Sequence, residues 1–280
     1  MTGVKGERPG TGALRPECLA DDVQHRNSGG DEVRLPIAFM AVCALAFAAS
    51  MSATVYFCRS MCCEMEMPGG WTMSMMWMRM RGQTWFASAL TFLLMWLAMM
   101  VAMMLPSALP TFLKTRRQLP SLCCMAFGYF AIWLAAGVGI YAFGLAFAAV
   151  AMRSETFSRA VPLLLSALLI AAGSIQFTHW KMTHLLRCRS PFGCAISCPQ
   201  HETSFRLGCK QGAACCICCA APMTIQLALG VMNPLVMIAV ATIIAAEKLL
   251  PRPAIVARFI GISTIIAGVR FFCVAFLRPA

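Results

Sequence analysis

Sulfur-bearing side chains dominate the chemistry that this sequence offers. The 280 residues include 22 Met and 16 Cys but only 4 His. Soft metal ions such as Cu(I) prefer thiolate and thioether ligands. The same side chains also serve as adaptable apolar packing, so composition alone favours neither use. The positions of the sulfurs along the chain have to decide.

The densest group of cysteines contains Cys215, Cys218 and Cys219. Their i, i+3, i+4 spacing places them on one face of a helix, and Met223 extends that face by another turn. Three converging sulfurs favour a trigonal site for a soft metal ion. The alternative is that these cysteines are small buried apolar residues.

Methionines repeat at helical spacing in a second segment. Met95, Met99 and Met103 form one stripe, and Met100 with Met104 forms a neighbouring one. Successive thioethers in a stripe lie ~6 Å apart along the helix axis. The stripes end before a Leu-Pro dipeptide, which predicts a break in the helix. Packing by adaptable side chains is again the alternative.

A third group of sulfurs follows the first apolar run, between Met61 and Met80. A thioether binds metal without losing a proton, so a Met-rich outer loop is suited to capturing Cu(I) or Ag(I) in an oxidising compartment. The alternative is an amphipathic helix that lies on a membrane surface. The candidate ligands in this segment are Cys62, Cys63, Met73, Met75 and Met76.

The composition excludes a soluble globular domain. Hydrophobic residues make up 60% of the chain and charged residues 12%, whereas soluble domains are about 25% charged. The long apolar runs therefore predict an all-α fold, a polytopic bundle of transmembrane helices. In such a protein the net charge of +12 marks cytoplasmic loops rather than nucleic-acid binding.

The apolar runs divide the chain into four parts. Residues 1–35 predict a disordered cytoplasmic tail, 36–57 a first span or signal anchor, 58–83 a Met- and Cys-rich outer loop, and 84–277 a membrane-helix domain. About seven spans are expected, or six if the first is lost. They are Pro36–Phe57, Thr84–Leu105, Leu122–Ala151, Ala160–Thr178, Gly212–Met232, Pro234–Leu249 and Ala254–Leu277. The fifth and sixth are expected to form a tight hairpin.

The distribution of Lys and Arg predicts that the N-terminus lies inside, with 16 of these residues in inner segments and 6 in outer ones. The Cys215 group and the Met99–Met104 segment then lie at similar depth, near the cytoplasmic side. The dipeptide Glu247-Lys248, which closes the sixth span, predicts an interfacial ion pair; the alternative is a contact in an ion or proton path.

The inner loop between the fourth and fifth spans is a further place where metal could bind. A tetrahedral Zn²⁺ site there would depart from the standard ligand spacings, so reduced, unliganded thiols are the alternative. The residues concerned are His179, His184, Cys188, Cys194, Cys198, His201 and Cys209.

Some functional classes are disfavoured by what the sequence lacks. It contains no Walker-type phosphate-binding loop, which argues against an ATP-driven pump. Its His residues fall in tails, loops or interfaces, where they cannot hold a membrane haem. No Ser-His-Asp or Cys-His arrangement is supported. The sequence therefore predicts a protein that is not an enzyme.

Several motifs occur together in order over residues ~70–275. They are Trp71–Trp85, Met95–Ser107, Gln176–Lys181, Cys215–Cys219, Gly230–Asn233 and Glu247-Lys248. This series resembles the bacterial family of predicted metal-binding integral membrane proteins, a domain of unknown function. The resemblance implies a multi-pass inner-membrane protein associated with copper. Ala214 stands where the family pattern has His, and Arg187-Cys188 stands where it has a Cys pair; both departures favour an all-sulfur site.

The sequence as a whole predicts an integral membrane protein that binds Cu(I) and transports or delivers it. The outer loop would capture the ion, Met99–Met104 would hold it at depth, and Cys215–Cys219 would receive it near the cytoplasm. The expected partners are the lipid bilayer and a copper chaperone or cuproenzyme, not nucleic acid. The competing hypothesis is a structural or assembly partner in the membrane whose Met side chains only pack.

Overall fold

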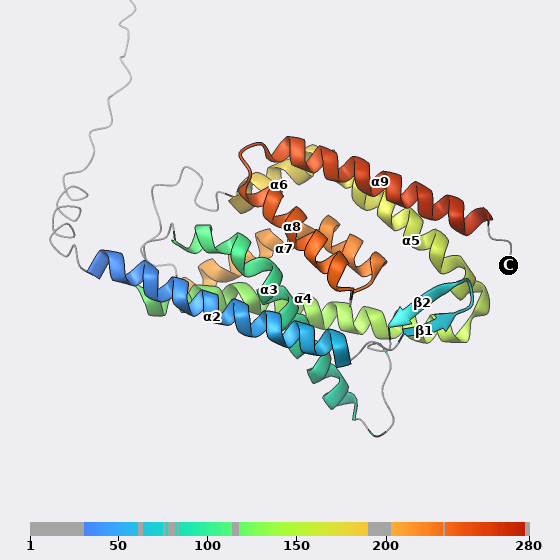
Figure 1. Cartoon of the computed structure of the whole chain (residues 1–280), viewed down its shortest axis with the longest axis horizontal. Helices are drawn as coiled ribbons and strands as arrows, with labels where there is room; N and C mark the ends of the chain where they lie inside the picture. The colour runs from blue at the N-terminus through green and yellow to red at the C-terminus, as the bar shows by residue number, and fades with distance from the viewer. Residues whose placement is uncertain are drawn as a thin grey trace, which may run out of the picture.

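The protein folds as an elongated bundle of helices, as the sequence predicts (Figure 1). The computed structural model describes residues 31–60, 64–74, 77, 82, 84–113, 118–189, 203–231 and 233–277. This part of the chain contains eight helices and one two-stranded hairpin.

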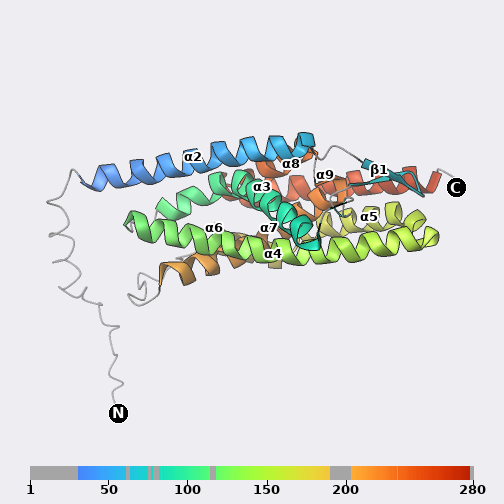
Figure 2. The ribbon, with the colours of Figure 1, turned by 90° about the horizontal axis from the view of Figure 1, so that it is seen from below.

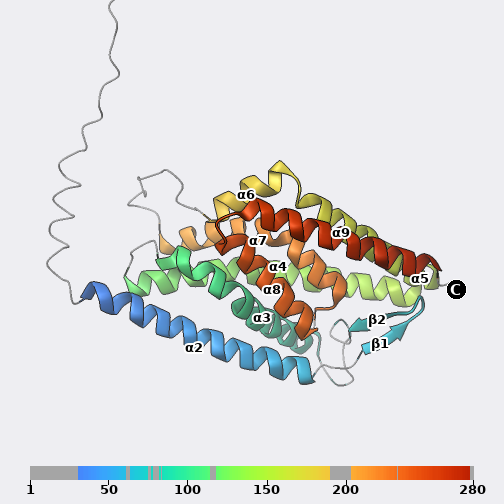
Figure 3. The same ribbon diagram turned by 45° about the horizontal axis from the view of Figure 1, so that its top comes forward.

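Six of the helices in the described residues are long and apolar enough to cross a membrane. They include the first predicted span. These six are α2 (Asp31–Ser60), α3 (Trp85–Leu113), α4 (Leu119–Arg153), α5 (Glu155–Ile175), α7 (Ser204–Leu229) and α9 (Pro253–Leu277). Helix α2 lies along one side of the bundle (Figure 2), and α9 runs beside α5 (Figure 3).

The end of α3 differs from the prediction, whereas α8 (Pro234–Leu249) is notable for its length. Helix α3 continues through Pro106 and Pro110, although a break was expected at the Leu-Pro dipeptide. Near the first of these prolines the Ser107 hydroxyl donates to the Met104 carbonyl (3.0 Å), one turn back along the same helix. Helix α8 has the predicted bounds but only 16 residues, about 24 Å of helix.

The expected hairpin between α7 and α8 is present. Gly230 has a φ of 113°, a left-handed conformation that glycine adopts without strain. The Asn233 side chain then caps α8 by accepting hydrogen bonds from the Leu235 and Val236 amides. This short connection places α8 beside α7, within reach of the cysteine face.

Helices α4 and α7 pack closely because glycines line their contact. A Cβ on Gly208 would collide with the Met125 carbonyl, and one on Gly212 would lie 2.7 Å from the Tyr129 carbonyl oxygen. Close approach of helix backbones through small residues is typical of membrane bundles. The contact brings Tyr129 against the cysteine-bearing face of α7.

The Met-rich outer segment differs from both sequence-based alternatives, because residues 64–74 form an antiparallel hairpin of β1 (Glu64–Met67) and β2 (Trp71–Ser74). Met65 lies opposite Met73, so alternation along the strands places the Met side chains on one face. Met67 and Met73 are buried in a small core with Ala148 and Ala151.

Candidate metal centre

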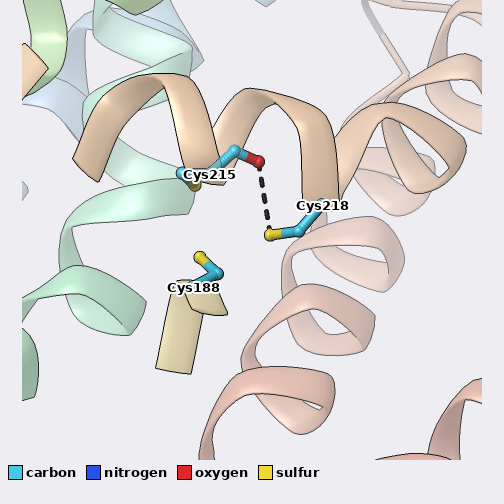
Figure 4. A group of neighbouring side chains, drawn as sticks. All are labelled: Cys188, Cys215 and Cys218. Atoms are coloured by element: carbon cyan, nitrogen blue, oxygen red, sulfur yellow. Dashed lines mark hydrogen bonds between the residues drawn. The ribbon is translucent and has the colours of Figure 1, made fainter. Parts of the chain in front are cut away.

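Four buried thiols from two helices converge in the bundle. Cys188 comes from the short helix α6 (His179–Arg189), and Cys215 and Cys218 come from α7. Their three Sγ atoms lie within 4.8 Å of one another (Figure 4). The Cys219 Sγ lies 3.8 Å from that of Cys215 and 3.6 Å from that of Cys218. We call these four residues the thiol cluster.

The local sequence explains the α7 half of the thiol cluster. The i, i+3, i+4 spacing turns Cys215, Cys218 and Cys219 inward, and Met223 on the same face is also buried. The intervening Cys216 is only half-buried. The α6 half is tied to α7 by the Gln211 amide, which donates to the Cys188 carbonyl (3.2 Å).

The spacing of the thiols suits a small soft ion. If a Cu(I)–sulfur bond is close to the ~2.3 Å of a Zn–S bond, the sulfurs of a trigonal site lie ~4 Å apart. The sulfurs of Cys188, Cys215 and Cys218 lie within 4.8 Å of one another, and Cys219 lies at a similar distance from the last two, so these pairs are near this separation. Copper could therefore bind with small movements of side chains.

A buried lysine and a tyrosine point at one thiol of the cluster. Lys248 donates from Nζ to the Cys215 Sγ (2.8 Å), and the Tyr129 hydroxyl donates to the same sulfur (2.9 Å). Within the described residues Lys248 has no carboxylate partner. A buried ammonium is costly unless it is paired with an anion. The Cys215 sulfur, as a thiolate, is the group in contact with Lys248 that can supply the negative charge. The cation would also offset the negative charge of a copper–thiolate complex.

A second buried lysine contacts the backbone of the thiol cluster rather than a sulfur atom. Lys181 forms an ion pair with Glu247 (Nζ–Oε2 2.8 Å) and donates to the Cys218 carbonyl (2.6 Å). The predicted interfacial pair between Glu247 and Lys248 is therefore wrong, because both side chains are buried and have other partners. Adjacent residues of a helix project about 100° apart, so they seldom pair with each other.

The position of Cys188 affects its protonation. Its hydrogen bond with Cys215, together with burial, raises the pKa of the Cys188 thiol to about 11. Cys188 therefore keeps its proton near neutral pH as long as no metal is bound. A metal ion that recruits this thiol must displace the proton, since the thiolate is the ligand.

The methionine stripes of α3 belong to the same core as the thiol cluster. The Met99 thioether accepts a hydrogen bond from the Gln226 amide of α7 (3.2 Å). The five side chains are at most 4% exposed, and they are Met95, Met99, Met100, Met103 and Met104. The structure thus places the two sulfur groups in one hydrophobic core, and the hydrogen bond that Met99 accepts comes from Gln226 rather than from a thiol.

An aromatic cluster packs around Phe92, at the end of α3 that follows the outer segment. Phe92 contacts Trp77 (5.4 Å between ring centroids), Trp96 (6.1 Å) and Tyr141 (4.9 Å). Trp96 is fixed in turn by its indole N–H, which donates to the Trp133 carbonyl (2.9 Å). These rings fill the space between the hairpin and the methionine stripes.

The remaining predicted residues do not join the thiol cluster. Met73 lies in the separate small core under the hairpin. In the inner segment, His184 contacts the Trp180 ring, and the Cys209 thiol donates to the Gly128 carbonyl. Other predicted ligands lie outside the described residues: Cys62, Cys63, Met75, Met76, Cys194, Cys198 and His201.

Sequence reasoning missed three partners of the α7 thiols. The sequence predicts Cys188 only as a candidate ligand of a separate inner-loop Zn²⁺ site, because its distance along the chain from Cys215 gives no spacing signal. Lys248 was assigned to an interface, although a charged residue next to an apolar run is itself a signal of function. Nothing in the sequence around Tyr129 predicts a role at the site, because only the packing of α4 on α7 brings this side chain to Cys215.

The fold and the site define a class of protein: an all-helical bundle with a buried cluster of thiols that could hold a soft metal ion. Residues 93–271 match the model of the PpoB2 family, described as copper chaperones. The chain belongs to this family, and copper handling is its family-level function. No curated protein and no solved structure matches the chain.

Proposed function

We propose that this protein is an integral membrane copper carrier that holds Cu(I) in the thiol cluster and delivers it to a copper-requiring partner. The observation that carries the proposal is the convergence of the buried Cys188, Cys215 and Cys218 thiols, with Cys219 beside the last two. The Lys248 ammonium lies 2.8 Å from the Cys215 sulfur. Such an arrangement is costly in a bundle that only packs, because it buries a cation without a carboxylate.

The α3 methionines supply a second set of soft ligands beside the thiols. Thioethers bind Cu(I) without losing a proton, whereas thiolates add charge and bind it more strongly. An ion that moves from the Met99 region to Cys215 therefore moves towards higher affinity. The buried position of both groups in one core supports this path.

Membrane insertion is the second element of the proposal. Six apolar helices have the necessary length, and many large apolar side chains on their outer faces are exposed, including Phe259 and Phe276. Lipid would cover such faces. With the N-terminus inside, the thiol cluster lies in the cytoplasmic half of an inner membrane.

Binding and delivery, rather than catalysis, is the role that this arrangement supports. The expected recipient is an enzyme that requires copper, or a further copper carrier. The burial of Met73 under the hairpin favours packing for this residue, so the proposed site is limited to the thiol cluster and the α3 methionines.

The direct test is copper binding by the full-length protein, purified in detergent under reducing conditions. We expect a high-affinity Cu(I) ion that is lost when Cys215 and Cys218 are both changed to Ser. The matched control is Cys273→Ser, which removes an exposed thiol of α9. Copper content that is the same in all three proteins would contradict the proposal and favour a structural or assembly role.

A further inference from the structure

A cavity lies directly beside the thiol cluster. Its volume is about 270 Å³, room for roughly nine water molecules at ~30 Å³ each. The ends of α3, α6 and α8 surround it. Its lining is Ser107, Ala108, Pro110, Thr111, Tyr129, Cys188, Arg189, Gln211, Lys248 and Leu249.

The charged residues that line the cavity are cations. Arg189 and Lys248 line it, and none of its described lining residues is acidic. The Arg189 guanidinium donates one hydrogen bond, from Nη1 to the Glu247 carbonyl (3.0 Å); since a guanidinium carries five N–H donors, others are left for a ligand. The buried Gln211 Oε1 has no hydrogen-bond partner among the residues that the structure describes. The cavity therefore suits a small molecule that carries negative charge and a donor group.

Only one member of the thiol cluster lines this cavity. Cys188 is in the lining, whereas Cys215, Cys218 and Cys219 are not. A molecule in the cavity would thus meet Cys188 first, beside the two cations. The cavity is too small for a folded protein segment, which leaves a low-molecular-weight compound as the occupant.

We propose that the cavity binds a small anionic thiol, which exchanges Cu(I) with Cys188. The proposal rests on the function proposed above, since it concerns the cargo of the thiol cluster. In the exchange a copper–sulfur bond to the incoming thiolate forms while the bond to Cys188 breaks. The incoming thiol gives up its proton and the released Cys188 sulfur takes one up, so copper stays Cu(I) and no electron is transferred. A reducing compartment supplies thiols of this kind.

The first experiment needs no copper. The full-length, metal-free protein in detergent is treated with iodoacetate, which is anionic, or iodoacetamide, which is neutral, and mass spectrometry measures alkylation at each cysteine. The ratio of the two rates cancels the thiolate fraction of the cysteine. Because the cations attract the anionic reagent, we expect this ratio to be about tenfold higher at Cys188 than for N-acetylcysteinamide, an uncharged free thiol in the same solution.

The variant Arg189→Gln should bring the ratio at Cys188 down towards that of the free thiol. The control Arg159→Gln, which removes a cation from an exposed surface pair with Glu155, should leave the ratio high. Equal ratios at Cys188 of the unmodified protein and at the free thiol, or a ratio unchanged by Arg189→Gln, would overturn the proposal.

The second experiment follows copper release to a chromogenic Cu(I) chelator after addition of thiols of similar size. The probes are 3-mercaptopropionate (anionic), 2-mercaptoethanol (neutral) and cysteamine (cationic). We expect the anionic thiol to release copper about tenfold faster than the cationic one at equal thiolate concentration, and Arg189→Gln to remove this order. Release at the same rate with all three thiols overturns the exchange step but leaves copper binding intact. A protein that binds no copper refutes the proposed function, whereas the alkylation ratios still report on the cavity.

Discussion

Two sulfur-rich regions of this molecule differ in what surrounds the sulfur. At the thiol cluster, Lys248 and Tyr129 donate hydrogen bonds to Cys215, and a polar cavity adjoins Cys188. Under the hairpin, Met67 and Met73 contact alanines and aromatic rings instead. Burial of sulfur is common to both regions, so burial does not identify a metal site. The polar and charged neighbours of the sulfur atoms distinguish the candidate metal site from the packed methionines.

The largest expected effect is loss of a thiol from the cluster. Cys215→Ser should lower the affinity for Cu(I) by more than the ~10- to 100-fold typical of losing a residue that supports a metal ligand. The reason is that Cys215 is both a candidate ligand and the acceptor for Lys248 and Tyr129. Competition with a chromogenic Cu(I) chelator measures the change.

Two observations make this first test decisive. Size-exclusion chromatography and helical circular dichroism should show that the Cys215→Ser protein is still folded. Cys123→Ser, at an exposed position of α4, should retain the affinity of the unmodified protein. If both variants bind copper equally well, the thiol cluster is not the site.

The two buried lysines should respond differently to replacement. Lys248→Met removes the cation beside Cys215 and should weaken copper binding ~10- to 100-fold. Lys181→Met leaves Glu247 as a buried unpaired charge, which should destabilise the fold by ~3–5 kcal/mol. Copper affinity and thermal unfolding, measured on both proteins, separate the roles. The distinction is wrong if Lys248→Met lowers the thermal stability as much as Lys181→Met does and leaves the copper affinity unchanged.

Copper binding at the thiol cluster should strengthen as the pH rises. The pKa of Cys188, about 11, keeps this thiol protonated between pH 6 and 8, and each proton that the metal displaces makes the affinity rise ~tenfold per pH unit. Chelator competition at several pH values gives the slope. An affinity that does not change over this range would mean that Cys188 is not recruited as a thiolate.

The smallest effect is expected at the hairpin. Met73→Leu conserves apolar volume and should cost less than ~1.5 kcal/mol of stability, with no change in copper content. Met99→Leu, in the same core as the thiols, should slow copper loading of the cluster. Metal analysis and stopped-flow loading compare the two variants. Reduced copper content in Met73→Leu would restore the hairpin as a binding region.

The helices were predictable because apolar runs of sufficient length define them. The shared face of Cys215, Cys218 and Cys219 followed from helical spacing alone. The hairpin was missed although its alternation was visible: Met65 and Met67 are separated by one residue, as are Trp71 and Met73, and a Pro-Gly-Gly turn lies between the two pairs. The high Met content of this segment favours an interpretation as a metal-binding loop, which hides the strand pattern.

The rest of the candidate site could not be derived from local patterns. Cys188 and Lys248 reach the thiols only because α6 and α8 pack against α7. The close contact of α4 with α7 depends on Gly128, Gly208 and Gly212, which form a pattern only when two separate helices are compared. Tertiary packing, rather than spacing along one helix, assembles a cluster of this kind.

For the membrane insertion that we propose, the short helix α8 has a consequence. Its 16 residues give about 24 Å of helix, whereas the hydrocarbon core of a bilayer is about 30 Å thick. Lipid around α8 would have to thin or the flanking side chains reach outward, at a fraction of a kcal/mol per ångström of mismatch. Acyl-chain length would then influence how firmly Lys248, at the end of this helix, stays against Cys215, and short-chain lipids should favour the copper-binding geometry.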